Sequence, residues 1–384
     1  MPLLREVIAR RIRSRGPIPF AEYMDLALYH PRYGYYAKVD RRSGRSGDFF
    51  TSVDVGTLFG ELLAAQFAEM WQCLQLGSNF DSDDCNLVEA AAGSGRLALN
   101  ILEALARTDP ELYDAVRLTL VERSSTARAS HIDTLGPHAW KLQRSTETVP
   151  AHIRGIVFAN ELLDALPVHP IVMTNSGLAE VYVDLHSRDR DRFVEYLAPP
   201  SAAVLAHVER FTIELEPGWR AEVSPKAVSW VEQTGRSLDA GFLVLIDYGH
   251  NASELYSASH SSGTLTTYHR HVIGTRGSHD PPARLLDPGV VDITAHVDLT
   301  AVRLAAEGVG LDTLAVVDQT YFLLGIGAAT WPAPTEGGET IKRRLALKTL
   351  LLPGGLGSTH KVLVFGKNVG TPQLRGCSFS QRVT

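Results

Sequence analysis

The chain is poor in cysteine, in long apolar runs and in excess charge of either sign. Its 384 residues include three cysteines, Cys73, Cys85 and Cys377, and no CxxC pair. They cannot form a disulfide framework, so the composition indicates a reducing compartment. No apolar run approaches the roughly 20 residues that a membrane-spanning helix needs. We therefore expect a cytoplasmic protein without a membrane span.

Charge and motif spacing argue against further classes. The formal net charge of −6 disfavours a protein that coats nucleic acid. His269, His271, His296 and His360 lie outside the HExxH and CxxC frames that hold zinc, so we predict no metal site. The Gly93-Ser94-Gly95 turn lacks the outer residues of a GxSxG nucleophile elbow.

The first fifteen residues carry five arginines among regularly spaced apolar residues. Arginine-rich starts are typical of transit peptides, but Glu6 and the lack of a serine-rich stretch favour an amphipathic first helix. The apolar spacing predicts further helices from Phe20 to Tyr29 and from Leu58 to Leu74. Near the other end we expect helices at Leu299 to Glu307 and Ile341 to Leu350.

Strand and helix patterns alternate from Leu87 to Asp247, which predicts a parallel sheet covered on both faces. Two segments interrupt this pattern. Strand-like runs between Pro170 and Glu216 indicate an antiparallel insertion, and the irregular stretch from His250 to Val291 indicates a second one. We expect an N-terminal helical, cofactor-covering segment (1–57) and a catalytic domain (58–384) with insertions at about 170–235 and 250–297.

The stretch LVEAAAGSGR (87–96) reads as a strand that ends in an acid, a turn of small residues and a helix beginning near Leu97. This order makes a crevice for a nucleotide-type cofactor, because small residues such as Ala91, Gly93 and Gly95 let the backbone approach a ligand. Glu89 would repel a pyrophosphate and attract the ammonium of S-adenosylmethionine (SAM). A tight strand-to-helix connection without a ligand is the alternative.

A second acid, Glu122, ends the apolar run that starts at Leu118. A carboxylate at this place can accept hydrogen bonds from both ribose hydroxyls of a cofactor. It follows Gly95 by 27 residues, which is late for a dinucleotide fold, and Ala91 replaces the first glycine of the three-glycine pattern. Both observations favour SAM over a nicotinamide cofactor, and a solvated strand-end glutamate is the alternative.

The segment NELLDALP (160–167) follows another central strand, where open α/β sheets bind ligands. A helical turn here would bring Glu161 and Asp164 together at i, i+3 spacing. With Asn160, this carboxylate pair could hold a guanidinium and remove the proton lost when nitrogen is methylated. Alternatively, Asn160 caps a helix and the acids complement its dipole.

Four motifs together resemble the MidA family: GDFFTS (47–52), NELLDALPV (160–168), IDYGH (246–250) and DITAHVD (292–298). These are SAM-dependent methyltransferases related to the mitochondrial complex I assembly factor, and the similarity runs from about Gly16 to Phe365. The resemblance implies a Rossmann-like seven-stranded methyltransferase sheet with an N-terminal helical segment and antiparallel or loop insertions. It also implies SAM as cofactor and methyl transfer to an arginine of a protein partner such as a respiratory-complex subunit.

By this resemblance Gly47, Asp48, Phe49 and Thr51 belong to the cofactor pocket. Gly47 permits an unusual backbone, Asp48 could meet the SAM amine, and Phe49 could cover the adenine. The chain departs from the family where Ala91-Ala92-Gly93 replaces a Gly-Pro-Gly pattern and Val53-Asp54 replaces Pro-Glu. Alanine costs stability only if the turn needs a positive φ, so we expect SAM binding to survive.

Three functions remain open on sequence alone. The first is SAM-dependent methylation of a protein arginine, with Tyr248 lining the substrate channel. The second is a non-catalytic assembly factor that binds SAM. The third is a nicotinamide-dependent oxidoreductase, which Glu89 disfavours. Methylation mainly requires positioning and desolvation of the reactants, so the sequence does not identify the acceptor, and it leaves the oligomeric state open.

Overall fold

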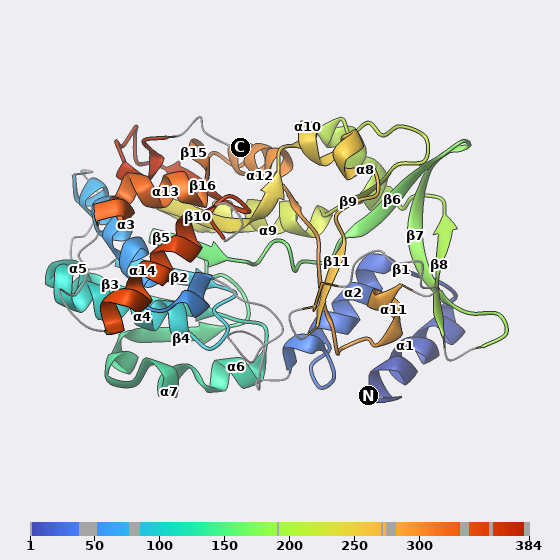
Figure 1. Ribbon diagram of the computed structural model, residues 1–384, viewed down its shortest axis with the longest axis horizontal. Helices are drawn as coiled ribbons and strands as arrows, with labels where there is room; N and C mark the ends of the chain where they lie inside the picture. Colours follow the sequence, from blue (N-terminus) through green and yellow to red (C-terminus); the bar gives the residue numbers. More distant parts are fainter. Residues whose placement is uncertain are drawn as a thin grey trace. The chain divides into compact units, whose positions relative to one another are not determined.

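The computed structural model describes residues 2–37, 52–76, 85–189, 192–269, 272–273, 282–330, 338–352 and 356–379. Contacts between Cα atoms divide the chain into two compact units made of interleaved segments. Unit 1 comprises residues 1–49, 163–230 and 249–302, and unit 2 comprises residues 50–162, 231–248 and 303–384. Figure 1 traces the elements of both units along the chain.

Unit 2 is built around a mostly parallel sheet with the strand order β15-β16-β10-β5-β2-β3-β4 (Figure 1). The parallel strands are β2 (Cys85–Ala90), β3 (Val116–Val121), β4 (Leu142–Thr146), β5 (Ile153–Asn160) and β10 (Leu238–His250). β16 (His360–Lys367) is antiparallel to both β10 and β15 (Asp312–Asp318). This seven-strand path confirms the methyltransferase-type sheet that the resemblance implies. Gly249 and His250, the last residues of β10, belong to unit 1 and pair with β14 (Val297–Asp298).

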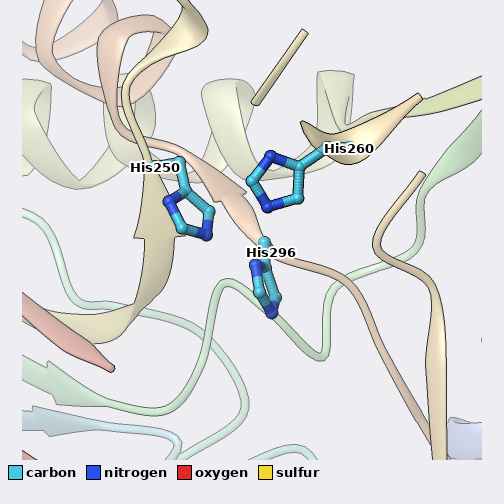
Figure 2. A group of neighbouring side chains, drawn as sticks. All are labelled: His250, His260 and His296. Atoms are coloured by element: carbon cyan, nitrogen blue, oxygen red, sulfur yellow. The ribbon is translucent and has the colours of Figure 1, made fainter. Parts of the chain in front are cut away.

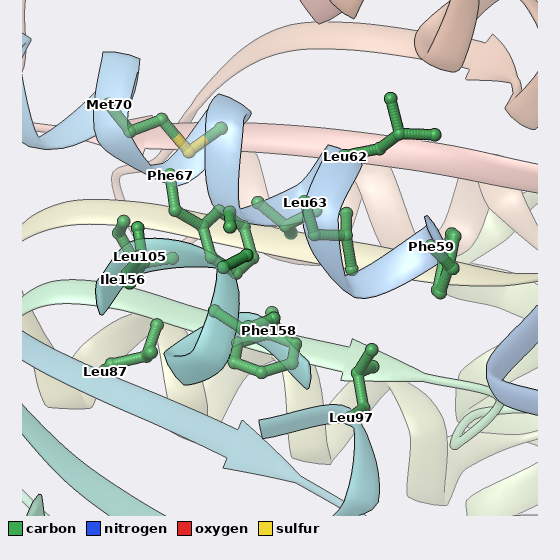
Figure 3. Close-up of a cluster of buried hydrophobic side chains, with 14 of the residues drawn as sticks. Phe59, Leu62, Leu63, Phe67, Met70, Leu87, Leu97, Leu105, Ile156 and Phe158 are labelled. Atoms are coloured by element: carbon green, nitrogen blue, oxygen red, sulfur yellow. The ribbon is translucent and has the colours of Figure 1, made fainter. Parts of the chain in front are cut away.

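Helices of unit 2 bury apolar side chains against this sheet. They are η2 (Ser52–Val55), α3 (Leu58–Gln75), α4 (Arg96–Thr108), α5 (Pro110–Ala115), α6 (Ser125–Ala129), α7 (His131–Leu135), η3 (Gly136–Lys141), α13 (Gln319–Ile326), η5 (Ala328–Thr330), α14 (Gly338–Leu351) and η6 (Arg375–Cys377). Figure 3 shows Phe67 of α3 facing Phe158 of β5, with ring centroids 5.1 Å apart. Leu87 of β2 and Leu97 of α4 are buried in the same cluster. This core holds β2 and β5, whose ends carry the candidate site.

The described residues of unit 1 form two antiparallel sheets. The larger has the order β1-β7-β6-β9, with β8 on the other edge of β7, and the smaller has the order β12-β11-β13. Their strands are β1 (Ile18–Pro19), β6 (His169–Thr174), β7 (Gly177–Leu185), β8 (Phe193–Ala198), β9 (Arg220–Val223), β11 (Thr266–His269), β12 (Val272–Ile273) and β13 (Asp292–Thr294). The pairing of β6, β7 and β8 confirms the antiparallel segment predicted after Pro170.

The helices of unit 1 are α1 (Pro2–Arg15), α2 (Phe20–Tyr29), η1 (Tyr35–Ala37), α8 (Ala202–Phe211), α10 (Ala252–Leu255), η4 (Ala258–His260) and α11 (Ala283–Leu286). α9 (Pro225–Ser237) and α12 (Leu299–Glu307) contribute residues to both units. Within the described ranges, no helix combines the length and the apolarity that crossing a membrane requires.

One core joins the three chain segments of unit 1. Leu4 and Ile8 of α1, Val181 of β7 and Ile293 of β13 are all buried in it. The apolar face of the first helix therefore packs against both segments that the sequence suggests are insertions. Apolar spacing shows that such a face exists, whereas its partner lies far away in the chain and has no local signal.

Helices and central strands with strong periodicity were predicted within a few residues. α2 has the predicted bounds, and α3 ends at Gln75, one residue after the predicted end. α8 was not predicted within the antiparallel segment. It begins after Ser201, whose hydroxyl accepts a hydrogen bond from the backbone N–H of Val204 at 3.4 Å. β15 and α13 also lacked a predicted counterpart.

Candidate cofactor and acceptor site

The strand order of unit 2 reverses between β2 and β5. From β2 the chain proceeds to β3 and β4 on one side, and from β5 it proceeds to β10 on the other. Ala90 of β2 pairs with Ala159 of β5, so the residues that follow both strands lie at the same edge. A switch point of this kind opens a crevice at the carboxyl ends of parallel strands.

The turn after β2 has the left-handed backbone that small residues favour. Ala91, Gly93 and Gly95 have φ values of +56°, +54° and +85°. Ala91 is therefore at a position that needs a positive φ, which is the condition under which the departure from a glycine pattern costs stability. The Ala92 N–H donates to the Val121 carbonyl at 3.1 Å, which ties the turn to the end of β3.

Glu89 lies inside this edge rather than at its surface. Its side chain is buried, and Oε2 accepts a hydrogen bond from the Ala98 N–H at 3.1 Å in the first turn of α4. The carboxylate replaces the side-chain cap that Gly95 cannot provide. Burial raises the pKa of Glu89 to about 8. A bound cation would stabilise the charged form of this carboxylate.

Glu122 bridges the turn and the segment after β3. Its Oε2 accepts from the Gly93 N–H at 2.9 Å, and its Oε1 accepts from the Ser124 N–H at 2.7 Å. Glu122 is therefore held in place by two backbone amides, and the reading of a merely solvated strand-end charge does not describe it. A carboxylate fixed in this way is suited to accept hydrogen bonds from ribose hydroxyls.

His131 connects the turn to β4, and it was not among the predicted site residues. Its Nε2 lies 2.9 Å from the Gly93 carbonyl and its Nδ1 lies 2.9 Å from Ser145 Oγ. A carbonyl can only accept, so Nε2 carries the proton and Nδ1 accepts from the hydroxyl. Burial lowers the pKa of His131, which favours this neutral form. No local motif marks this residue, because its partners are remote in the chain.

The prediction of a helical turn after Asn160 is wrong. No helix forms between residues 160 and 168, and Glu161 itself has a φ of +54°. The Glu161 N–H donates to the Ile246 carbonyl of β10 at 2.8 Å, which continues the sheet instead of starting a helix. The alternative in which Asn160 caps a helix is excluded for the same reason.

The Glu161 carboxylate has neighbours from two parts of unit 2. Its Oε1 accepts from Asn160 Nδ2 at 3.1 Å and lies 3.4 Å from Nε2 of the buried His360. The His360 ring lies 4.0 Å, centroid to centroid, from that of Tyr248, and its Nδ1 is 3.0 Å from the Leu356 carbonyl. The sequence pointed to His360 only as a possible metal ligand, whereas its Nε2 faces the Glu161 carboxylate and makes no hydrogen bond among the described residues.

The remaining predicted residues fall elsewhere. Asp164 belongs to unit 1, where its side chain is buried and its carbonyl accepts from the Ala295 N–H at 3.1 Å. The expected pairing of Glu161 with Asp164 through a helical turn is therefore lost with that helix. Gly47, Asp48, Phe49 and Thr51 lie outside the described residues. Nearby, Asp54 forms an ion pair with Arg96.

Two observations show that this edge has space and an unused hydrogen-bond acceptor for a ligand. A Cβ placed on Gly93 meets no described atom within 4 Å, so open space adjoins the turn. Asn160 Oδ1 is buried and has no hydrogen-bond partner among the residues that the structure describes, so it can accept an N–H from a ligand. With Glu89 and Glu122, the edge offers carboxylates for an ammonium group and for ribose hydroxyls.

Known proteins resemble this chain over most of its length. Residues 62–317 match a family described as "Putative S-adenosyl-L-methionine-dependent methyltransferase". The protein arginine methyltransferase NDUFAF7, mitochondrial, of Bos taurus is 31% identical over 351 aligned positions, covering 85% of this chain and 73% of that protein. Its Homo sapiens counterpart is 29% identical over 354 positions, with coverage of 85% and 73%.

A solved structure extends the likeness to three dimensions. It is a crystal structure of a "likely methyl transferase" from Burkholderia thailandensis bound to S-adenosyl-homocysteine. Its sequence is 29% identical, and it superposes with a TM-score of 0.86, covering 99% of this chain and 96% of that chain. These likenesses confirm the methyltransferase resemblance and SAM as the cofactor, and they decide against a nicotinamide-dependent oxidoreductase. None of these descriptions uses the name MidA, so that name stays a prediction.

The expected cytoplasmic location is contradicted. Relatives from Rattus norvegicus to Drosophila melanogaster are named mitochondrial. The expectation rested on low cysteine content and the absence of long apolar runs. Both features describe how a chain folds, whereas location depends on targeting signals that receptors read.

Proposed function

Because the chain belongs to the family of S-adenosyl-L-methionine-dependent methyltransferases, we propose that its methyl acceptor is an arginine side chain of a partner protein. The observation that carries this proposal is the placement of Glu161. Its carboxylate follows β5 at the switch point, next to the strand that leads into the cofactor turn. The relatives named protein arginine methyltransferases support the same acceptor.

The cofactor side of the proposed site consists of Glu89, the turn from Ala91 to Gly95, and Glu122. Glu89 would face the ammonium group and Glu122 the ribose hydroxyls, while His131 keeps the turn in shape. When bound, SAM supplies a methyl group on a positively charged sulfur, which keeps the electron pair of the broken carbon–sulfur bond. The role of these residues is to hold that group without water between it and the acceptor.

On the acceptor side, Glu161 would bind the guanidinium through charge-assisted hydrogen bonds and take up the proton that the methylated nitrogen loses. Asn160 donates a hydrogen bond to its Oε1, which orients the carboxylate, and His360 Nε2 lies 3.4 Å from the same oxygen. The buried Asn160 Oδ1 adds an acceptor for a further N–H group. Tyr248, whose ring lies 4.0 Å from that of His360, completes the set of unit 2 residues that we assign to acceptor binding, and a role for Asp164 stays a prediction from the sequence.

The test compares Glu161→Gln with wild type and with Glu103→Gln, a matched change at an exposed position of α4. We expect Glu161→Gln to keep its affinity for S-adenosylhomocysteine and its melting temperature but to lose methyl transfer by 100-fold or more in single turnover. Glu103→Gln should match wild type in all three. Normal turnover with glutamine at position 161 would disprove the role of Glu161 as base.

The acceptor class needs its own measurement. Mass spectrometry of proteins from a deletion strain and its parent should show the loss of methylarginine at one or a few sites, and we propose a respiratory-complex subunit among them. Purified enzyme and labelled SAM should restore the mark on protein from the deletion strain. A lost mark on lysine or on a carboxylate would keep the methyltransferase and refute the arginine assignment. Binding of SAM with no lost mark would favour the non-catalytic assembly factor.

A further inference from the structure

Three histidines of unit 1 come together from separate places in the chain. His250 ends β10, His260 ends η4, and His296 lies between β13 and β14. One ring nitrogen from each lies within 4.8 Å of the others. Figure 2 shows the three rings around a common space, each with a nitrogen turned toward it. We propose that His250, His260 and His296 bind a divalent transition-metal ion of the zinc type.

Glu254 lies beside two of these rings and forms a hydrogen bond with one of them, His260. Its Oε1 lies 3.0 Å from His250 Nδ1, and its backbone carbonyl lies 2.9 Å from His260 Nδ1. The hydrogen bond of His260 Nδ1 to a carbonyl, which can only accept, leaves Nε2 of that ring as the deprotonated nitrogen that can bind a metal. Carboxylate or carbonyl partners of this kind are the usual support of histidine ligands in metal sites.

The third ring is placed by its backbone and by burial. The His296 N–H donates to Thr264 Oγ1 at 3.0 Å, which fixes where the side chain starts. His296 Nδ1 is buried and lacks a hydrogen-bond partner within the described part of the chain. Such a nitrogen is costly unless something binds it.

Three imidazoles select the class of ion. Nitrogen ligands suit zinc and its neighbours in the first transition row, whereas magnesium and calcium prefer oxygen. Zinc–nitrogen bonds of about 2.0–2.1 Å place tetrahedral ligands roughly 3.4 Å apart, so the rings need only a small rotation to close on the ion. The fourth position would be left to water.

A metal here would tie three segments of unit 1 that the sequence separates. No sequence motif indicates this site, because the ligands have neither the i, i+4 spacing of a helical site nor a short cysteine or histidine pair. Of the histidines that were considered as ligands, only His296 takes part. The site is independent of the proposed methyl transfer and uses none of its residues.

The test uses the full chain, freed of metal with a chelator and dialysed against zinc ions alone. We expect one tightly bound zinc per chain, a higher melting temperature with zinc, and visible absorption of a four-coordinate ion when cobalt replaces zinc. His260→Ala and His296→Ala should each weaken zinc binding at least tenfold and abolish the cobalt bands. His152→Asn is the matched control, because His152 is an exposed histidine outside the cluster and asparagine tolerates its φ of +58°.

A variant that is damaged in its fold would have a lower melting temperature than wild type in metal-free buffer. Because His260 is half-exposed, His260→Ala should disturb the fold least. Two results would overturn the proposal. Wild type could take up no stoichiometric zinc at micromolar concentration. Alternatively, the metal-free His260→Ala variant could melt like wild type and still bind zinc with unchanged affinity and cobalt spectrum.

Discussion

Ala91 occupies a backbone position that favours glycine. Its φ of +56° places it in the left-handed region, which costs an L-residue about 1–2 kcal/mol. We predict that Ala91→Gly raises the free energy of unfolding by about 1 kcal/mol, because relief of strain exceeds the added freedom of the unfolded chain. Urea denaturation checks this. Ala206→Gly, in the exposed middle of α8, should lower the free energy of unfolding. A lower free energy of unfolding for both variants would contradict the proposal that Ala91 is strained.

Glu89 makes stability depend on pH. Its pKa is about 8 in the folded protein and near 4.5 when solvated, so the folded state holds the proton more tightly. The stabilisation is complete below pH 4.5 and is lost as pH rises through 8, at up to about 1.4 kcal/mol per pH unit. We predict that Glu89→Gln, which keeps an acceptor for Ala98, removes this part of the pH dependence.

Binding of the cofactor should show the opposite trend with pH. The ammonium of S-adenosylhomocysteine favours the ionised carboxylate, so we predict that affinity for this ligand rises with pH up to about 8 in wild type. Calorimetry at several pH values checks this, and Glu89→Gln should show weaker binding that varies less with pH. An equal pH dependence in both proteins would remove Glu89 from cofactor binding.

At the scale of elements, a pair of glycine substitutions distinguishes a loss of cofactor binding at the turn from the effect of backbone strain. Gly93 and Gly370 have φ values of +54° and +65°, and an added Cβ meets no described atom within 4 Å at either. We predict that Gly93→Ala lowers affinity for S-adenosylhomocysteine at least tenfold, because its methyl group enters the space beside the turn. Gly370→Ala should lose similar stability and keep the affinity. Equal affinities in the two variants would place the cofactor elsewhere.

Elements were predictable where their signal is local. Apolar spacing located α2 and α3, and the run of apolar residues before Glu89 located β2. The prediction for the segment from Asn160 onward was wrong because its acidic and apolar residues are compatible with the start of a helix and equally with an extended chain that is hydrogen-bonded to the adjacent strand. The hydrogen bond from Glu161 to Ile246 decides between them, and that partner lies on another strand.

At the scale of the molecule, the sequence could not predict which distant segments contact one another. Glu89, Gly93 and Glu122 could be proposed as cofactor ligands because a strand, a turn and an acid follow one another along the chain. His131, His360 and the histidine cluster were not found, because each gains its role from residues that are distant in sequence. Likewise α1 and the predicted insertions share a core that periodicity alone does not reveal.

The division into two units predicts that the two ligands protect different parts of the chain. The residues assigned to the cofactor turn and ribose lie in unit 2, and the histidine cluster lies in unit 1. In hydrogen exchange, S-adenosylhomocysteine should slow amides of 91–98 and 122–131 at least tenfold, since a ligand stabilises what it contacts. Zinc should slow amides of 250–260 and around His296. Protection by S-adenosylhomocysteine of unit 1 alone would mean that the cofactor site is misassigned, and protection by zinc of unit 2 alone would mean the same for the metal site. In either case the assigned residues would exchange as fast with the ligand as without it, which a bound ligand does not allow.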